Sequence, residues 1–148
     1  MIYETAINQF KSDVFNNSAL KSKIIDGTYD LLLADRQGDS PDEETFGSAI
    51  KMFHDLKVYN SFEATMLAKS QQYVVSWADR ECTDRELPDY VTEAVKFMDA
   101  EMQRCEKFDL DLSTRRDLLT LLEDHLIEGK EAELGRIEIS PELSSRRS

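Results

Sequence analysis

Apolar residues recur at helical spacing along most of this chain, and that periodicity limits the possible folds more than any other feature of the sequence. Residues three and four positions apart share one face of an α-helix, whereas alternate residues share one face of a strand. No segment sustains the alternation of a strand. Only five glycines and three prolines occur among the 148 residues, which favours long helices. We predict an all-α fold, a helical bundle of about six helices.

The helix boundaries follow from start and stop signals in the sequence. The predicted helices cover residues 3–15, 20–36, 41–56, 60–82, 88–108 and 114–128. Ser40 and Ser113 are predicted as N-caps, because their hydroxyls can accept from the first amides of a helix. Gly38 and Gly129 are predicted as stops, since glycine takes the left-handed conformation that often ends a helix.

Each predicted helix has a stripe of residues expected to face a core. These residues are Ile7, Phe10 and Val14; Ile24, Thr28, Leu31 and Leu32; Phe46, Ile50, Phe53 and Leu56; Phe62, Met66, Tyr73 and Trp77; Val91, Val95, Met98, Met102 and Cys105; and Leu118, Leu119, Leu122 and Leu126. The stripe from Val91 to Cys105 has the spacing of a seam that packs against a partner helix. We expect Phe53, Trp77 and Met98 to be buried in one core.

The third helix has the strongest start signal in the chain. Residues 40–43 read Ser-Pro-Asp-Glu, which is a capping box with proline at the first helical position. The Ser40 hydroxyl would accept from the amide of Glu43, and the Glu43 carboxylate would accept from the amide of Ser40. Replacing Ser40 by alanine would then cost about 1 kcal/mol.

Charge and composition exclude several classes of protein. The formal charge is −12, from 30 acidic and 18 basic residues, so direct nucleic-acid binding is not expected. No apolar run reaches the roughly 18 residues of a membrane-spanning helix, and the first residues lack the basic and apolar regions of a secretory signal. Cys82 and Cys105 are the only cysteines. We expect both to be reduced thiols in a nuclear or cytoplasmic protein.

Metal sites require side chains that converge, and the sequence does not predict such a site. His54 and His125, the only histidines, are expected to face solvent or to cap helices. The segment from Asp109 resembles the start of a calcium-binding EF-hand loop. Thr114 and Thr120, however, stand where that loop needs glycine and glutamate. The segment is therefore expected to be a turn between helices.

Catalytic candidates are weak as well. Cys82 has acidic and basic neighbours, so its thiol is not clearly activated. Glu101 is expected on an exposed helix face, without the pocket that acid–base catalysis needs. Trp77 and Tyr73 are expected to be core residues rather than a binding platform. We predict no catalytic residue, no cofactor-binding residue, no metal site and no enzymatic activity.

Several short motifs, read in order, resemble the N-terminal helical repeat of the cullins, the elongated scaffolds of ubiquitin ligases. The motifs are Asp35-Arg36-Gln37-Gly38, Leu56-Lys57-Val58-Tyr59 with Ser61-Phe62-Glu63, Tyr73, Glu86-Leu87-Pro88-Asp89-Tyr90-Val91, Glu101-Met102-Gln103-Arg104, Ser113-Thr114, and the leucine-rich stretch from Leu118 to Ile127. Their order and spacing carry the resemblance, which covers about residues 6–134. It points to the second repeat of a cullin of the cullin-4 type.

Residues 135–148 are expected to form a flexible tail, because the apolar pattern ends after Leu134. The resemblance implies a cullin-repeat-like helical domain at residues 1–134. It implies a non-enzymatic scaffold that spaces the substrate receptor of a ubiquitin ligase from the catalytic end. The implied partners are other subunits of the ligase, without direct contact to nucleic acid or membrane. In cullins the adaptor-binding helices belong to the first repeat, so no adaptor-contact residue is carried over. A free-standing acidic helical interaction module is the alternative.

Overall fold

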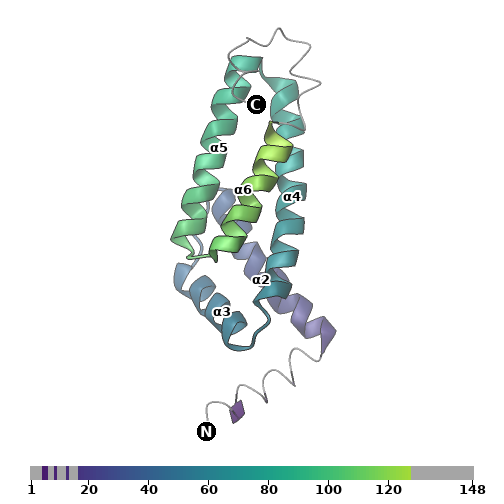
Figure 1. Cartoon of the computed structure of the whole chain (residues 1–148), viewed down its shortest axis with the longest axis vertical. Helices are drawn as coiled ribbons and strands as arrows, with labels where there is room; N and C mark the ends of the chain where they lie inside the picture. Colours follow the sequence, from purple (N-terminus) through teal and green to yellow (C-terminus); the bar gives the residue numbers. More distant parts are fainter. Residues whose placement is uncertain (1–4, 7–8, 10–12, 14–16, 128–148) are drawn as a thin grey trace. The chain divides into compact units, whose positions relative to one another are not determined.

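The computed structural model describes residues 5–6, 9, 13 and 17–127. Its helices are α2 (Ser18–Arg36), α3 (Glu43–Asp55), α4 (Tyr59–Asp84), α5 (Leu87–Lys107) and α6 (Leu112–Leu126), shown in Figure 1. The described residues contain no strand, so the all-α prediction is confirmed, with five helices there rather than about six. Most of the predicted helix at 3–15, the predicted stop at Gly129 and the predicted tail lie outside the described residues.

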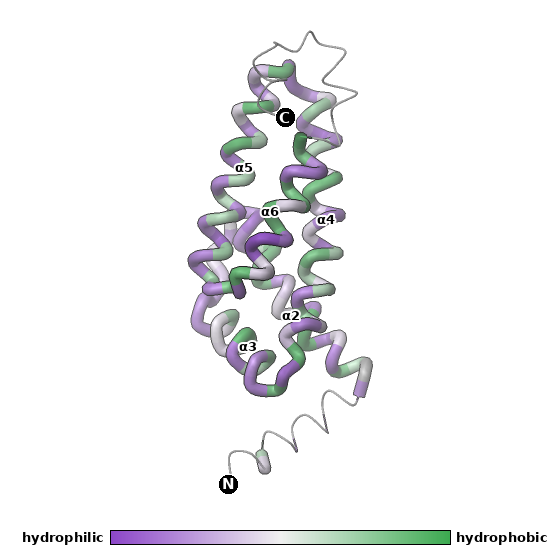
Figure 2. Tube along the Cα trace, in the orientation of Figure 1, coloured by the Kyte–Doolittle hydropathy of each residue, from purple (hydrophilic) through white to green (hydrophobic). Residues whose placement is uncertain are grey.

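The chain divides into two compact units. The first unit comprises residues 1–68 with 108–110, and the second comprises residues 69–107 with 111–148. Helices α2 and α3 lie in the first unit, α5 and α6 lie in the second, and α4 contributes to both. Figure 2 shows that hydrophobic positions recur between hydrophilic ones along each helix. Each helix can therefore bury one face and expose the other.

Aromatic rings fill the core of the first unit. Phe62 of α4 is fully buried, and its ring centroid lies 5.3 Å from that of Phe53 and 6.2 Å from that of Phe46. Phe108 adds a fourth ring, 4.4 Å from Phe46. Such offset and edge-on arrangements stabilise a core beyond the area that they bury. The predicted stripe of α3 is confirmed, because Phe46, Ile50, Phe53 and Leu56 are all buried.

Helix α2 ends in a turn at Gly38, as predicted from the sequence. Gly38 has a φ of 93°. The amide of Asp39 donates to the carbonyl of Ala34 at 2.9 Å, and the amide of Gly38 donates to that of Asp35 at 3.1 Å. This pair of bonds is the Schellman motif, which satisfies carbonyls that the helix leaves unpaired.

Helix α3 ends in the same motif without a glycine. The amide of Val58 donates to the carbonyl of Phe53 at 2.8 Å, and the amide of Lys57 donates to that of His54 at 3.0 Å. Lys57 takes the left-handed position, with a φ of 60°. A residue with a Cβ pays about 1–2 kcal/mol for that conformation. This turn was not predictable from the sequence, because lysine is not a usual residue at the left-handed position.

The predicted capping box at Ser40 is wrong. The N-cap of α3 is Asp42, whose carboxylate accepts from the amides of Glu44 at 3.0 Å and Thr45 at 3.2 Å. The Thr45 hydroxyl also donates to this carboxylate, at 2.8 Å. The helix begins at Glu43, so Ser40 and Pro41 precede it. An aspartate directly before a helix caps as well as serine does, and here it lies in the better place.

Aromatic residues of α4 and α5 pack against one another in the second unit. The ring of Phe97 lies 4.5 Å from Trp77 and 6.2 Å from Tyr73, and Trp77 lies 6.2 Å from Tyr90. Trp77 and Tyr73 are half-buried and pack against these rings, as expected of core residues. Helix α6 lies alongside α5 in Figure 1. It buries Leu118, Leu122 and Leu126.

The predicted stripe of α5 is correct at Cys105, but the other buried positions differ from those predicted. The buried residues are Tyr90, Ala94, Glu101 and Cys105, whereas the predicted Val95 is 52% exposed. Val91, Met98 and Met102 are only half-buried. The prediction followed valine and methionine, but the structure buries a tyrosine, a small alanine and a paired glutamate instead.

Three further expectations were wrong. Leu119, expected to face the core, is 36% exposed. Ser113 lies inside α6 rather than capping it, and the N-cap position is taken by Asp111, whose side chain makes no capping hydrogen bond. Phe53 is buried, whereas Trp77 and Met98, which were expected to be buried with it, are only half-buried.

Replacing Phe53 by alanine should reduce the free energy of unfolding by about 3–5 kcal/mol, because it removes a fully buried ring that stacks on Phe62. Urea titration followed by circular dichroism measures the loss. Leu119→Ala is the matched control, since that side chain is 36% exposed and should change stability little. A loss below about 1 kcal/mol for Phe53→Ala would contradict its place in the core.

Replacing Asp42 by alanine should lower the Tm by about 2–4 °C, because two amides of α3 lose their acceptor. The hydrogen bond from Thr45 lowers the pKa of Asp42. A carboxylate with a lower pKa in the folded state stabilises the fold above its unfolded pKa, and this stability is lost as pH falls through the folded pKa. The Tm difference should therefore be full at neutral pH and fade in strong acid.

Ser40→Ala is the control for this experiment. Ser40 lies outside α3 and supplies no cap, so its replacement should leave the Tm unchanged at every pH. Equal losses for Ser40→Ala and Asp42→Ala in thermal melts would restore the capping box.

Candidate functional site

The motifs that resemble the cullin repeat lie at helix ends and at contacts between helices. Arg36, in the first unit, is the first example. Arg36 occupies the last turn of α2, where a positive charge interacts favourably with the helix dipole. Its Nη1 donates to the hydroxyl of Tyr29 at 3.2 Å, and its guanidinium carbon lies 6.0 Å from the centre of that ring. Tyr29 is buried. Arg36 therefore fixes the helix end beside Gly38, which turns the chain.

Tyr90 joins the beginning of α5 to the end of α6 in the second unit. Its hydroxyl donates to the backbone carbonyl of Leu126 at 2.6 Å. This carbonyl is in the last turn of α6, where helices leave carbonyls without an intrahelical partner. Tyr90 is 2% exposed and packs with Ala94, Trp77 and Leu87. The tyrosine thus combines a packed ring with a buried hydrogen bond.

Glu101 and Arg104 form a buried ion pair on α5. The Nη1 of Arg104 donates to the carboxylate of Glu101, and the side chains are 12% and 3% exposed respectively. The prediction that Glu101 lies on an exposed face is wrong. A charge is buried at low cost only when a partner is present, and the partner here is three residues along the same helix. Among the described residues, no buried side-chain nitrogen or oxygen lacks a hydrogen bond.

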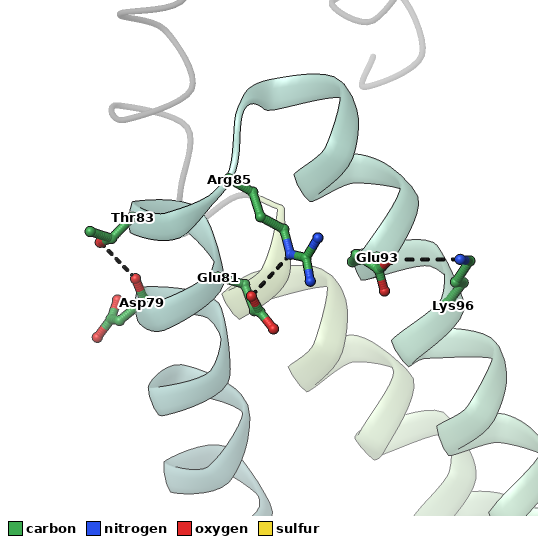
Figure 3. Close-up of polar contacts among 6 residues, drawn as sticks. All are labelled: Asp79, Glu81, Thr83, Arg85, Glu93 and Lys96. Carbon is green, nitrogen blue, oxygen red and sulfur yellow. Dashed lines mark hydrogen bonds and ion pairs between the residues drawn. The ribbon is translucent and has the colours of Figure 1, made fainter.

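A second ion pair fixes the end of α4, as Figure 3 shows. The Nε of Arg85 donates to the carboxylate of Glu81 at 3.0 Å, and the guanidinium points toward α5. The hydrogen bond to Glu81 raises the pKa of Arg85, and the negative charges of Glu93 and Asp89 on α5 act in the same direction. Lys96 pairs with Glu93 at 3.6 Å. Both ion pairs are local, because each joins residues three or four positions apart in the sequence.

The histidines and cysteines lie at separate places in the helices. His54 is in the last turn of α3, exposed, with its ring stacked 4.3 Å from that of Tyr59. His125 is in the last turn of α6. Cys82 is half-buried against the Tyr90 cluster, and Cys105 is buried. No group of three metal-ligating side chains occurs in the part of the chain that the structure describes. The absence of catalytic and cofactor residues stays a prediction.

Sequence reasoning missed some of the residues that fix helix ends. Asn17 is the N-cap of α2, and its side chain accepts from the amides of Ala19 and Leu20. The signal was present, because asparagine is among the best N-caps, but the predicted helix began only at residue 20. The inter-helix turn after α5 was predicted, although the left-handed backbone of Asp109, with a φ of 52°, was not.

These features are typical of an all-helical structural domain, in which the motif residues terminate helices and connect neighbouring helices. None of the helices within residues 17–127 has the length and apolar content that crossing a membrane requires. The family model described as the cullin alpha solenoid domain matches residues 1–144. The chain belongs to the cullin family.

Three relatives give the match more detail. Over 127 residues the chain is 29% identical to Cullin-4A of Mus musculus and 28% identical to Cullin-4A of Homo sapiens. It is 24% identical to Cullin-4 of Dictyostelium discoideum over 127 residues. Each alignment covers 85% or 86% of this chain but only 16% or 17% of the relative. The predicted resemblance to a cullin-4-type N-terminal repeat is confirmed.

Breaking the Glu101–Arg104 pair from one side should cost about 3–5 kcal/mol, because a buried charge loses its partner. Arg104→Met and Glu101→Leu should each show this loss in urea titration. The double variant should recover most of it, since apolar side chains of similar size can replace a buried pair. Losses that simply add in the double variant would show that the two residues act independently.

Proposed function

We propose that this chain serves as a scaffold segment of a cullin-4-like ubiquitin ligase and holds a substrate receptor at a fixed distance from the catalytic end. The observation that carries the proposal is the match to the cullin alpha solenoid domain over residues 1–144, together with cullin-4 relatives. A solenoid repeat contributes length and direction, because each repeat packs only against its neighbours.

The contacts within each unit support a mechanical role. A spacer must keep its helices from sliding or fraying under load at its ends. In the second unit, Tyr90 ties α5 to the last turn of α6, and Arg85 pairs with Glu81 near the end of α4. In the first unit, the Schellman turns after Arg36 and Asp55 hold the helix ends. Each of these residues has a structural role that requires no substrate.

Several finer statements belong to the same proposal. The cullin-repeat-like domain spans residues 1–134 and corresponds to the second repeat of the cullin arm. The chain is not an enzyme, binds no cofactor or metal, and acts in the nucleus or cytoplasm. Its partners are other subunits of a cullin-type ligase, and it contacts neither nucleic acid nor membrane directly.

A free-standing acidic interaction module is the second candidate. The charge of −12 favours it, because an acidic surface attracts basic partners and speeds their association. In this case the chain would dock its partner through its own surface rather than through a neighbouring repeat.

A chimera tests the spacing role. Residues 1–144 would replace the aligned segment of mouse Cullin-4A, and the assembled ligase would be assayed for ubiquitin transfer to a receptor-bound substrate. We expect transfer to be retained. A glycine-serine linker of the same length is the control and should abolish it, because a flexible linker does not hold a fixed distance. A folded chimera that fails as completely as the linker would refute the spacing role.

Calorimetry separates the two candidates. If the chain is a second repeat, it should bind the β-propeller adaptor of the ligase only weakly, because specific affinity depends on a few buried anchor residues of the first repeat. Any residual binding should weaken as salt is added. Nanomolar, salt-insensitive binding by the isolated chain would instead favour the interaction module.

A further inference from the structure

Ser40 lies in an exposed connection between α2 and α3 and has no structural role there. The connection covers residues 37–42, and residues 39–42 have no regular secondary structure. Asp42 supplies the cap of α3, so the Ser40 hydroxyl is not needed for that purpose. Within the described part of the chain, this hydroxyl makes no hydrogen bond. The side chain is exposed and available to a second molecule.

The backbone around Ser40 also favours access. Gly38, with a φ of 93°, turns the chain away from the axis of α2. Pro41 disfavours helical geometry at the residue before it, and Ser40 has no regular secondary structure. Because Pro41 has no amide proton, this stretch donates no hydrogen bond from that position. An enzyme can therefore take up the segment without first breaking helix hydrogen bonds at Ser40.

Ser40 and Pro41 together form a sequence that a class of enzymes recognises. A serine followed directly by proline is the pattern that proline-directed protein kinases read, and here the proline is half-buried while the serine is exposed. We propose that Ser40 is a phosphorylation site for a proline-directed serine/threonine kinase. This assignment goes beyond the proposed scaffold function and does not depend on it.

The reaction is an ordinary phosphoryl transfer from ATP. The Ser40 oxygen attacks the γ-phosphorus of Mg-bound ATP, the new Oγ–P bond forms, and the bond from that phosphorus to the β-phosphate oxygen breaks. The hydroxyl proton passes to the catalytic aspartate of the kinase, and ADP leaves. No electrons are exchanged with an outside oxidant or reductant.

Phosphorylation would concentrate negative charge at the start of α3. A phosphoserine carries about −1.5 to −2 charges at neutral pH. Asp39, Asp42, Glu43 and Glu44 already surround Ser40 in sequence. The two amides nearest the cap are occupied by Asp42, so the phosphate adds charge at the surface without replacing the cap.

The test is in vitro phosphorylation of the full chain. The sequence contains a second Ser-Pro dipeptide at Ser140, so the experiment uses a Ser140→Ala background. A proline-directed kinase of the cyclin-dependent or mitogen-activated class is supplied with Mg-ATP, and the product is examined by intact mass and fragment mapping. We expect the mass of one added phosphoryl group, located on Ser40. Ser40→Ala and Pro41→Ala should each lose it, with circular dichroism confirming that both variants fold.

A synthetic peptide covering residues 35–46 is the accessibility control. Modification of the peptide but not of the folded chain would overturn the proposal, because it would show that the fold withholds Ser40. Failure of both would overturn it as well, since the sequence would not be a substrate of this kinase class. Unchanged phosphorylation of the Pro41→Ala variant would refute the proline-directed assignment.

Discussion

A helix leaves its last carbonyl oxygens without partners, and in this chain the way each one is satisfied decides where the helix stops and how the chain turns. Helices α2 and α3 both end in Schellman turns, one built on Gly38 and the other on Lys57. Helix α6 uses a different solution, in which the hydroxyl of Tyr90 reaches a carbonyl of its last turn. The cores form around helices whose ends have been fixed in this way.

The sequence predicted the fold class and the buried stripe of α3 because the large residues there are unambiguously apolar. Phe46, Phe53 and Leu56 leave only one side of the helix to face a core. The stripe of α5 was misplaced except at Cys105, because its buried face includes Glu101, whose charge argues for solvent unless its partner is known. Periodicity counts apolar residues and cannot recognise an ion pair that makes a glutamate suitable for burial.

Helix starts were harder to predict than helix faces. Residues 40–43 read as a capping box with Ser40 as the cap, yet Asp42 lies two residues nearer the helix and has a carboxylate that accepts from two amides. Several residues in one short segment can act as N-caps. The helix starts that they predict differ by only one or two residues, so the sequence does not choose between them. The candidate site was also only partly predictable from the sequence. The order of the motifs identified the family. The contacts that give Arg36 and Tyr90 their roles depend on distances in three dimensions.

The hydrogen bond between Tyr90 and Leu126 spans 36 residues of sequence. Closing a loop of that length costs entropy before the contact forms, so the end of α6 is completed only after α5 has docked. Local opening of a protein is reported by exchange of its amide hydrogens with solvent. The amides in the last turn of α6 should therefore exchange at the rate at which α5 and α6 separate, which makes that turn a natural reporter of cooperativity within the second unit.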